Sequence, residues 1–269
     1  MSDEATAVPD EIDLSRPSAA RVYDYYLGGA HNFAVDREMA RQAVGMWPDL
    51  PLIMQANRAF LRRAVRYCVA AGVRQFLDLG SGIPTVGNVH EVARAEAPDA
   101  RVVYVDNDPI AAAYSRSILG DDPRTAVVQA DLRRPDLVLS RPEVASLLDL
   151  SQPVAVMMVA VLHFVPDEDD PVGVVAAYRD AVAPGSLLVV SHATTEGQPV
   201  QADEHSQLYR RTPTPMSMRS RAQVTAFFDG FELVDPAVVF LPLWRPASRD
   251  DVDEHPERFT GLAAVGRKP

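Results

Sequence analysis

Residues 76–82, with the sequence FLDLGSG, place two glycines directly after a short apolar run. The run is typical of the end of a buried strand, and apolar residues recur at helical spacing over residues 86–97. Between them, Gly80 and Gly82 allow a tight turn that leaves bare N–H groups beside a ligand. A strand, a glycine turn and a helix open a nucleotide-binding βαβ unit; the alternative is an ordinary turn between a strand and a helix.

Apolar runs alternate with helical patterns through the middle of the chain. Strands are predicted at residues 74–79, 101–105, 126–130, 154–162 and 187–191. Helices are predicted between them at residues 86–97, 109–119, 143–149 and 171–183, with Asp108-Pro109 and Asp170-Pro171 as start signals. Continuous apolar runs are typical of parallel strands that are covered on both faces, so the alternation predicts a doubly wound sheet.

The two ends of the chain differ from this middle part. Residues 17–71 predict helices and no strand, whereas 231–241 and 259–265 predict strands that pair as antiparallel neighbours. We therefore expect an α/β fold with a mostly parallel sheet of seven strands, an antiparallel last strand and an N-terminal helical cap. The expected divisions are a disordered tail at 1–15, the cap at 16–72 and the core at 73–269, with a substrate-side segment at about 194–220.

The composition of the chain limits which kinds of partner and ligand it can bind. The formal net charge of −11 argues against a nucleic-acid backbone as a general partner. Cys68 is the single cysteine, which excludes an internal disulfide, and the six histidines are scattered without metal-ligand spacing. No apolar run is long enough for a signal peptide or a bilayer span. We expect a cytoplasmic protein with no metal and no membrane partner.

Two acids follow the second and third predicted strands. Asp106 stands 24 residues after Gly82, where a carboxylate can accept hydrogen bonds from both hydroxyls of a ribose. The alternative is that Asp106 only caps the turn, a role that Asp108 already fills. At Asp131 a carboxylate can accept a hydrogen bond from the exocyclic amine of adenine, and the alternative is a solvated loop acid.

These loops, taken in this order, resemble successive motifs of the class I S-adenosylmethionine-dependent methyltransferases. The matching positions are Asp78-x-Gly80-x-Gly82, Asp106, Ala130-Asp131 and the segment LHFVPD at residues 162–167. The segment RVYDYYLGGAHNF at 21–33 is similar to the opening signature of an actinobacterial methyltransferase-like family whose substrates are largely unassigned. NRAF at 57–60 and SHA at 191–193 also fit that family, and the resemblance covers residues 17–268.

The resemblance implies an enzyme that binds S-adenosyl-L-methionine and methylates a small molecule. The cofactor-binding residues that it implies are Asp78, Gly80, Ser81, Gly82, Asp106, Asn107, Asp131 and Leu132. In the N-terminal segment, Tyr23 could offer an aromatic face to the sulfonium, or lie in the buried stripe of a helix. Gly28, Gly29 and Asn32 could hold the amino-acid end of the cofactor, or form an ordinary turn.

His163 is the best candidate for a general base, with a structural hydrogen-bonding role as the alternative and with His31 and His192 as weaker candidates. Because the cofactor carries the reactive group, methyl transfer needs no dedicated nucleophile. A second hypothesis is a non-catalytic sensor or partner protein that binds the cofactor. A third is an NAD-dependent oxidoreductase, against which Thr85 argues, since it replaces the third glycine of that fingerprint. The acidic run 167–170 predicts a helix start and not a metal site.

Overall fold

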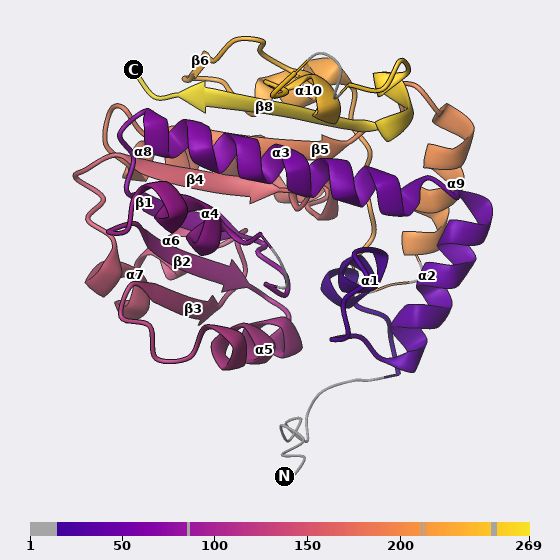
Figure 1. Cartoon of the computed structure of the whole chain (residues 1–269), viewed down its shortest axis with the longest axis horizontal. Helices are drawn as coiled ribbons and strands as arrows, with labels where there is room; N and C mark the ends of the chain where they lie inside the picture. The colour runs from indigo at the N-terminus through magenta and orange to yellow at the C-terminus, as the bar shows by residue number, and fades with distance from the viewer. Residues whose placement is uncertain (1–14, 85–86, 211, 213, 249–251) are drawn as a thin grey trace, which may run out of the picture.

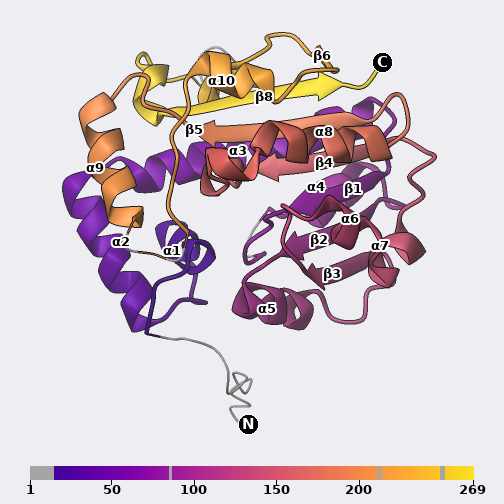
Figure 2. The same ribbon diagram turned by 180° about the vertical axis from the view of Figure 1, so that it is seen from behind.

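The computed structural model describes residues 15–84, 87–210, 212, 214–248 and 252–269. Within these ranges the chain forms one sheet of eight strands with helices on both faces (Figures 1 and 2). The strands are β1 Gln75–Leu79, β2 Arg101–Asp106, β3 Thr125–Gln129, β4 Val154–Val159, β5 Leu187–Ala193, β6 Glu232–Leu233, β7 Val239–Phe240 and β8 Gly261–Arg267. Residues 1–14 of the predicted tail, Thr85, and the predicted helix start at residue 86 lie outside the described residues.

The observed helices largely agree with those predicted from the spacing of apolar residues. They are α1 Ala19–Tyr26, α2 Ala34–Met46, α3 Leu50–Ala70, α4 Val89–Glu96, α5 Pro109–Leu119, α6 Pro135–Leu139, α7 Pro142–Leu147, α8 Pro171–Ala181, α9 Pro199–Tyr209 and α10 Arg221–Ala226. Helix α3 contains Pro51 in its first turn, where proline is tolerated. Helices α6 and α9 were not predicted.

The strand order is β3-β2-β1-β4-β5-β8-β6, with β7 also paired to β8. Strands β1 to β5 pair in parallel, and β8 runs antiparallel to β5, β6 and β7. The predicted doubly wound sheet with an antiparallel finish is confirmed. It has eight strands because the predicted strand 231–241 is divided around Pro236, which has no N–H to donate to a ladder.

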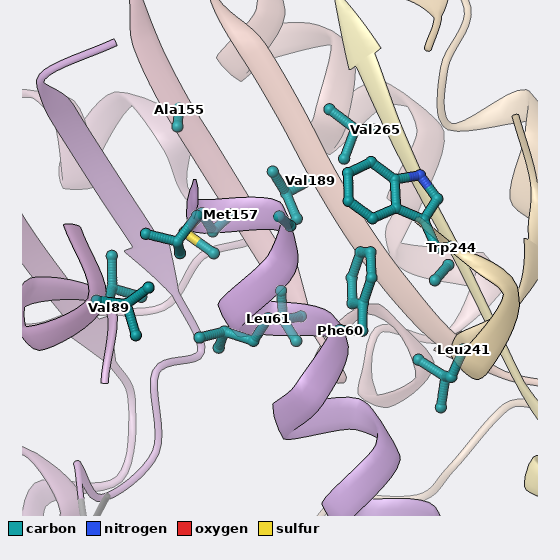
Figure 3. Close-up of a cluster of buried hydrophobic side chains, with 14 of the residues drawn as sticks. Phe60, Leu61, Val89, Ala155, Met157, Val189, Leu241, Trp244 and Val265 are labelled. Atoms are coloured by element: carbon teal, nitrogen blue, oxygen red, sulfur yellow. The ribbon is translucent and has the colours of Figure 1, made fainter. Parts of the chain in front are cut away.

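Two hydrophobic layers cover the sheet. On one face, α3 and α4 pack against alternate strand residues, and Figure 3 shows Phe60 and Leu61 of α3 beside Met157, Val189 and Val265. On the other face, α6, α7, α8 and α10 pack against the intervening residues (Figure 2). Helix α3 is therefore part of the layer that covers the sheet.

Helices α1, α2 and α9 lie beyond the carboxyl ends of the parallel strands (Figure 1). Helix α2 contacts both α1 and α9. The strand order reverses between β1 and β4. The connections that leave the carboxyl ends of these two strands therefore run to opposite sides at that point. Residues of α1 and α9, together with Trp47 directly after α2, line the space above this point. No helix in the described part of the chain is both long enough and apolar enough to cross a bilayer.

Candidate functional site

A cavity of about 590 Å³ lies at the carboxyl ends of the strands. Its lining comes from the ends of β1, β2, β4 and β5, the loop after β3, and helices α1, α3 and α9. Open α/β sheets bind ligands at this position, where the strand order reverses. The predicted residues that line it are Asp78, Gly80, Ser81, Gly82, Asp106, Asn107, Asp131, Leu132, Tyr23 and His163.

The glycine turn is tight, as predicted, but its N–H groups are not free. Gly80 and Gly82 have φ values of +70° and +63°. The N–H groups of Gly80 and Ser81 donate to the carbonyl of Val105 at 2.8 and 3.1 Å, and that of Gly82 donates to Asp106 Oδ2 at 2.7 Å. The expectation of bare N–H groups is therefore wrong, because the turn closes onto β2. A turn that uses its N–H groups internally suits a ligand held by carboxylates better than a pyrophosphate.

Asp106 lies at the end of β2 and is 8% exposed. Besides the Gly82 bond, its Oδ1 accepts a hydrogen bond from the N–H of Asp108 at 2.9 Å, while Asp108 itself caps α5 as predicted. Burial raises the pKa of Asp106 to about 6, although these backbone hydrogen bonds lower it. Each carboxylate oxygen keeps a further lone pair, so Asp106 can still accept from two hydroxyl groups.

Asp78 lies on β1 and lines the same cavity. Burial raises its pKa to about 7, Arg58 lowers it, and Asp106 raises it further. Arg58 also donates from Nη2 to Asn88 Oδ1 at 2.9 Å. A cationic group of a ligand beside Asp78 would compensate this buried negative charge.

Asp131 follows β3 and forms an ion pair with Arg133, whose Nε lies 3.0 Å from Oδ1. Arg133 also reaches Asp169 at 2.6 Å. Burial raises the pKa of Asp131, but the hydrogen bonds and charge of Arg133 outweigh burial and lower it overall. The adjacent Leu132 is nearly buried, and its carbonyl accepts a hydrogen bond from Tyr178 at 3.0 Å. This end of the cavity offers an ionised acceptor beside an apolar wall.

A chain of hydrogen bonds holds Tyr23, which lines the cavity. Asn57 Nδ2 of α3 donates to the Tyr23 hydroxyl at 2.9 Å, and Ser191 Oγ of β5 donates to Asn57 Oδ1 at 2.6 Å. Ser191 Oγ in turn accepts from the N–H of Ala160 at 2.9 Å. Ala160 lies after β4 and has φ of +56°, which is uncommon for a residue with a side chain. The chain connects α1, α3, β5 and β4.

Gly28, Gly29 and Asn32 do not line the cavity. Asn32 Nδ2 donates to Asp24 Oδ2 at 2.8 Å and to the Gly29 carbonyl at 2.9 Å, and the N–H of His31 also donates to Asp24 Oδ2 at 2.8 Å. The three predicted residues therefore form a turn that surrounds Asp24. Asp24 is the residue that lines the cavity, and its buried Oδ1 lies beside the turn, 4.0 Å from His31 Nδ1.

The N-terminus of α1 is joined to the loop that follows β2. Ser18 Oγ donates a hydrogen bond to Asp108 Oδ2, and Arg21 Nη1 lies 3.6 Å from the same oxygen. Arg21 is held in place by Asp36, whose Oδ2 lies 2.8 Å from its Nε. Residues far apart in the sequence thereby close the cavity on the side of Asp106.

His163 follows β4, is 6% exposed and lines the cavity. Its Nδ1 accepts a hydrogen bond from the N–H of Ala193 at 3.4 Å, so the proton of the neutral ring lies on Nε2. Burial holds the pKa of His163 well below its ordinary value, and the neighbouring His192, His205 and Arg219 lower it further. In this state His163 is a hydrogen-bond donor, which does not favour the predicted role of general base.

The other two histidine candidates, His31 and His192, contact other protein groups through their rings. His192 Nδ1 lies 2.7 Å from the carbonyl of Ala193, and its Nε2 lies 3.0 Å from Arg219 Nη1. His31 does not line the cavity, and its ring packs edge-on against Tyr114 at 4.7 Å. Within the acidic run, Asp170 caps α8 as predicted and Asp167 bonds Arg219. The described residues contain no group of three or more His, Cys, Asp or Glu that could hold a metal ion.

Several lining residues were missed in the sequence. Asn57 offered a signal, because it lies on the apolar face of a predicted helix, where a polar residue needs a partner. Trp47, His205 and Tyr209 offered none, since they meet only when α9 packs against α2.

Comparison with known proteins agrees with this geometry. The S-adenosyl methyltransferase family matches residues 5–269. A DUF574 family protein from Streptomyces avermitilis is 41% identical, with a TM-score of 0.91 over 96% of this chain and 99% of that one. A candidate methyltransferase from Thermobifida fusca is 43% identical, also with a TM-score of 0.91, over 98% of this chain and 99% of that one.

A more distant structure shares the fold alone. The N-methyltransferase NodS from Bradyrhizobium japonicum, in complex with S-adenosyl-L-homocysteine, is 14% identical, with a TM-score of 0.50 over 93% of this chain and 99% of that one. Among curated proteins, none matches this chain. The family match and the two full-length neighbours show that this chain belongs to the S-adenosyl methyltransferase family and is an S-adenosylmethionine-dependent methyltransferase with the class I fold.

Proposed function

We propose that this methyltransferase acts on a small molecule that binds in the part of the cavity enclosed by α1, the end of α2, and α9. The observation that carries the proposal is the extent of the cavity. It continues from the acids at β1, β2 and β3, past the ends of β4 and β5, to Trp47 and His205. An enclosed space of this kind suits a small acceptor, and the net charge of −11 does not favour a nucleic acid.

The donor and acceptor set at the other end fits S-adenosylmethionine. We propose that Asp106 accepts hydrogen bonds from the ribose hydroxyls, and that Asp131 and Leu132 contact the adenine. The carboxylates of Asp78 and Asp24 would face the amino-acid end, where their negative charge suits an ammonium group. When bound, the cofactor supplies an activated methyl group on a positively charged sulfur.

The protein's own contribution is alignment and the exclusion of water. Tyr23, held by Asn57 and Ser191, fixes the wall between the two halves of the cavity. His163 would orient the acceptor through its Nε2 proton. Within residues 16–72, we propose that α1 and the end of α2 act as the cap over the acceptor, while α3 joins this segment to the sheet. The buried free thiol of Cys68 is compatible with a reducing cytoplasm, where we propose that the protein works.

Isothermal calorimetry with S-adenosylmethionine and S-adenosylhomocysteine tests the cofactor site. Asp106→Ala should weaken binding by roughly 1.5–3 kcal/mol for each charged hydrogen bond lost, or about 10- to 150-fold. Asp121→Ala changes an exposed acid after α5 and should leave the affinity as it is. An unchanged affinity of Asp106→Ala would remove Asp106 from the site. For the acceptor half, turnover confined to macromolecular substrates would contradict the proposal.

A further inference from the structure

Aromatic side chains from four separate elements line the half of the cavity away from the acids. We call this set the aromatic subsite: Tyr26 of α1, Trp47 after α2, Phe164 after β4, and His205 and Tyr209 of α9. The His205 ring centroid lies 5.8 Å from that of Trp47 and 5.0 Å from that of Tyr209, and Tyr209 lies 5.6 Å from Phe164. Phe164 in turn meets His163 at 4.4 Å, so the rings lead toward the centre of the cavity.

The subsite also gathers polar atoms that have no partner. Trp47 Nε1 and both ring nitrogens of His205 are buried without a hydrogen-bond partner among the described residues, whereas the Tyr26 hydroxyl is paired with Tyr209. Tyr26, Trp47 and His205 are 5%, 3% and 4% exposed. Buried polar groups in native proteins are nearly always satisfied, and each one left unpaired costs about 1–3 kcal/mol. Two such side chains in contact on one cavity wall indicate that a partner arrives from within the cavity.

The subsite is uncharged. Its other neighbours include the apolar side chains of Leu50, at the start of α3, and of Met216. The carbonyl of Met216 accepts a hydrogen bond from Ser206 of α9 at 2.8 Å. Burial lowers the pKa of His205 to about 4, so its ring is neutral near pH 7, with one nitrogen that donates and one that accepts. An ionised ligand would lose its hydration there without a countercharge from these side chains.

We propose that the aromatic subsite binds an uncharged, planar aromatic acceptor that carries at least one hydroxyl or carbonyl group. Flat rings pack against aromatic side chains at centroid separations of about 4.5–7 Å, the range that the subsite rings already keep among themselves. The polar substituent pairs with Trp47 or His205. This inference rests on the proposed small-molecule acceptor and names its chemical class.

The two tryptophans of the chain provide a direct test. Trp47 lies in the subsite, whereas Trp244 is packed in the core against Tyr67 and against Phe60, and Figure 3 shows the latter pair. In the 15N-labelled full chain, Trp47→Phe assigns the two indole N–H signals. The probes are 2-naphthol, which is neutral and planar; 2-naphthoate, which is charged; and decahydro-2-naphthol, which is not planar. Each is titrated with and without S-adenosylhomocysteine.

We expect 2-naphthol to shift the Trp47 indole signal, to leave that of Trp244 unchanged, and to bind at least tenfold more tightly than the other two probes. His205→Phe keeps a ring but removes both nitrogens, and should weaken 2-naphthol binding about tenfold. Glu204→Ala, which changes the exposed neighbour of His205, should have no effect. Unchanged affinity for S-adenosylhomocysteine in His205→Phe shows that the variant is folded.

The outcomes separate this inference from the proposed function. Equal affinity for the three probes, or no shift of the Trp47 signal, overturns the aromatic acceptor and indicates that water alone satisfies the subsite. If S-adenosylhomocysteine still binds in that case, the cofactor site stands. If 2-naphthol shifts Trp47 while S-adenosylhomocysteine does not bind, the subsite stands and the methyl-transfer function fails.

Discussion

Replacing Asp78 by asparagine should stabilise the protein above neutral pH and weaken its affinity for the cofactor. Asp78 is 6% exposed at the end of β1, and burial raises its pKa from an ordinary value of 3.8 to about 7. At about 1.4 kcal/mol for each unit of pKa, this difference corresponds to about 4 kcal/mol between the two protonation states. Asparagine has nearly the same shape and carries no charge.

The pH dependence follows from the direction of this shift. Below about pH 4 the carboxyl is protonated in both the folded and the unfolded chain, so it contributes no difference. Between about pH 4 and pH 7 the folded protein keeps the proton that the unfolded chain has lost, and the free energy of unfolding of the wild type falls as pH rises. Above about pH 7 both states are ionised and the loss is complete.

Urea denaturation of the cofactor-free protein at pH 5 and pH 8, followed by circular dichroism, measures the difference. Asp78→Asn should exceed the wild type by about 4 kcal/mol at pH 8 and by less than about 2 kcal/mol at pH 5. The buried Asp106 adds a pH dependence of the same sign to both proteins, which cancels in the comparison. Asp99→Asn, which changes a well-exposed acid, should show no such dependence.

Two results would refute this reasoning. One is a stability difference of the same size at both pH values, because the charge of Asp78 would then not be its source. The other is a variant less stable than the wild type at pH 8, which would mean that Asp78 makes a net favourable interaction in the folded protein. Calorimetry on the same samples should show weaker binding of S-adenosylmethionine to Asp78→Asn, since the amino-acid end would lose a countercharge.

Three further substitutions test the packing around the site by urea denaturation. Gly80→Ala should destabilise the protein by roughly 2–4 kcal/mol, because φ is +70° and an added Cβ would lie 2.1 Å from Val161 Cγ2; a loss below 1 kcal/mol would be incompatible with that contact. Trp244→Ala should cost roughly 3–5 kcal/mol, since its fully buried ring packs edge-on against Phe60, and a surface-like effect would contradict this. Ala160→Gly should stabilise by roughly 0.5–1 kcal/mol, because glycine relieves φ of +56°; a loss would mean that the backbone is not strained.

Much of the fold was accessible from local patterns. The strand ends and the N-cap of α5 depend on neighbouring residues, so continuous apolar runs and the Asp108-Pro109 pair located them closely. The convergence of Asp78, Asp106 and Asp131 on one cavity also followed, because parallel strands carry their carboxyl ends to the same edge of the sheet.

The predictions were wrong where a polar group has several possible hydrogen-bond partners and the tertiary structure decides which one it meets. The N–H groups of the glycine turn were expected to be free, but they bond Val105 and Asp106, a choice that depends on how closely β1 approaches β2. In the N-terminal segment the turn formers were expected in the site, whereas they hold Asp24 there. Helix α9 was missed because its sequence is largely polar and its few apolar residues become buried only against distant helices.

By itself, then, the sequence determined how the five parallel strands alternate with helices along the chain. It also determined the glycine turn and the acids that follow the strands. These features depend on residues a few positions apart, whose spacing the sequence states directly. Only the tertiary structure decided the second half of the cavity, in which Trp47 and His205 meet although they lie far apart along the chain. That contact forms because α2 and α9 bury their apolar faces together, and its polar atoms are left unsatisfied by the same packing.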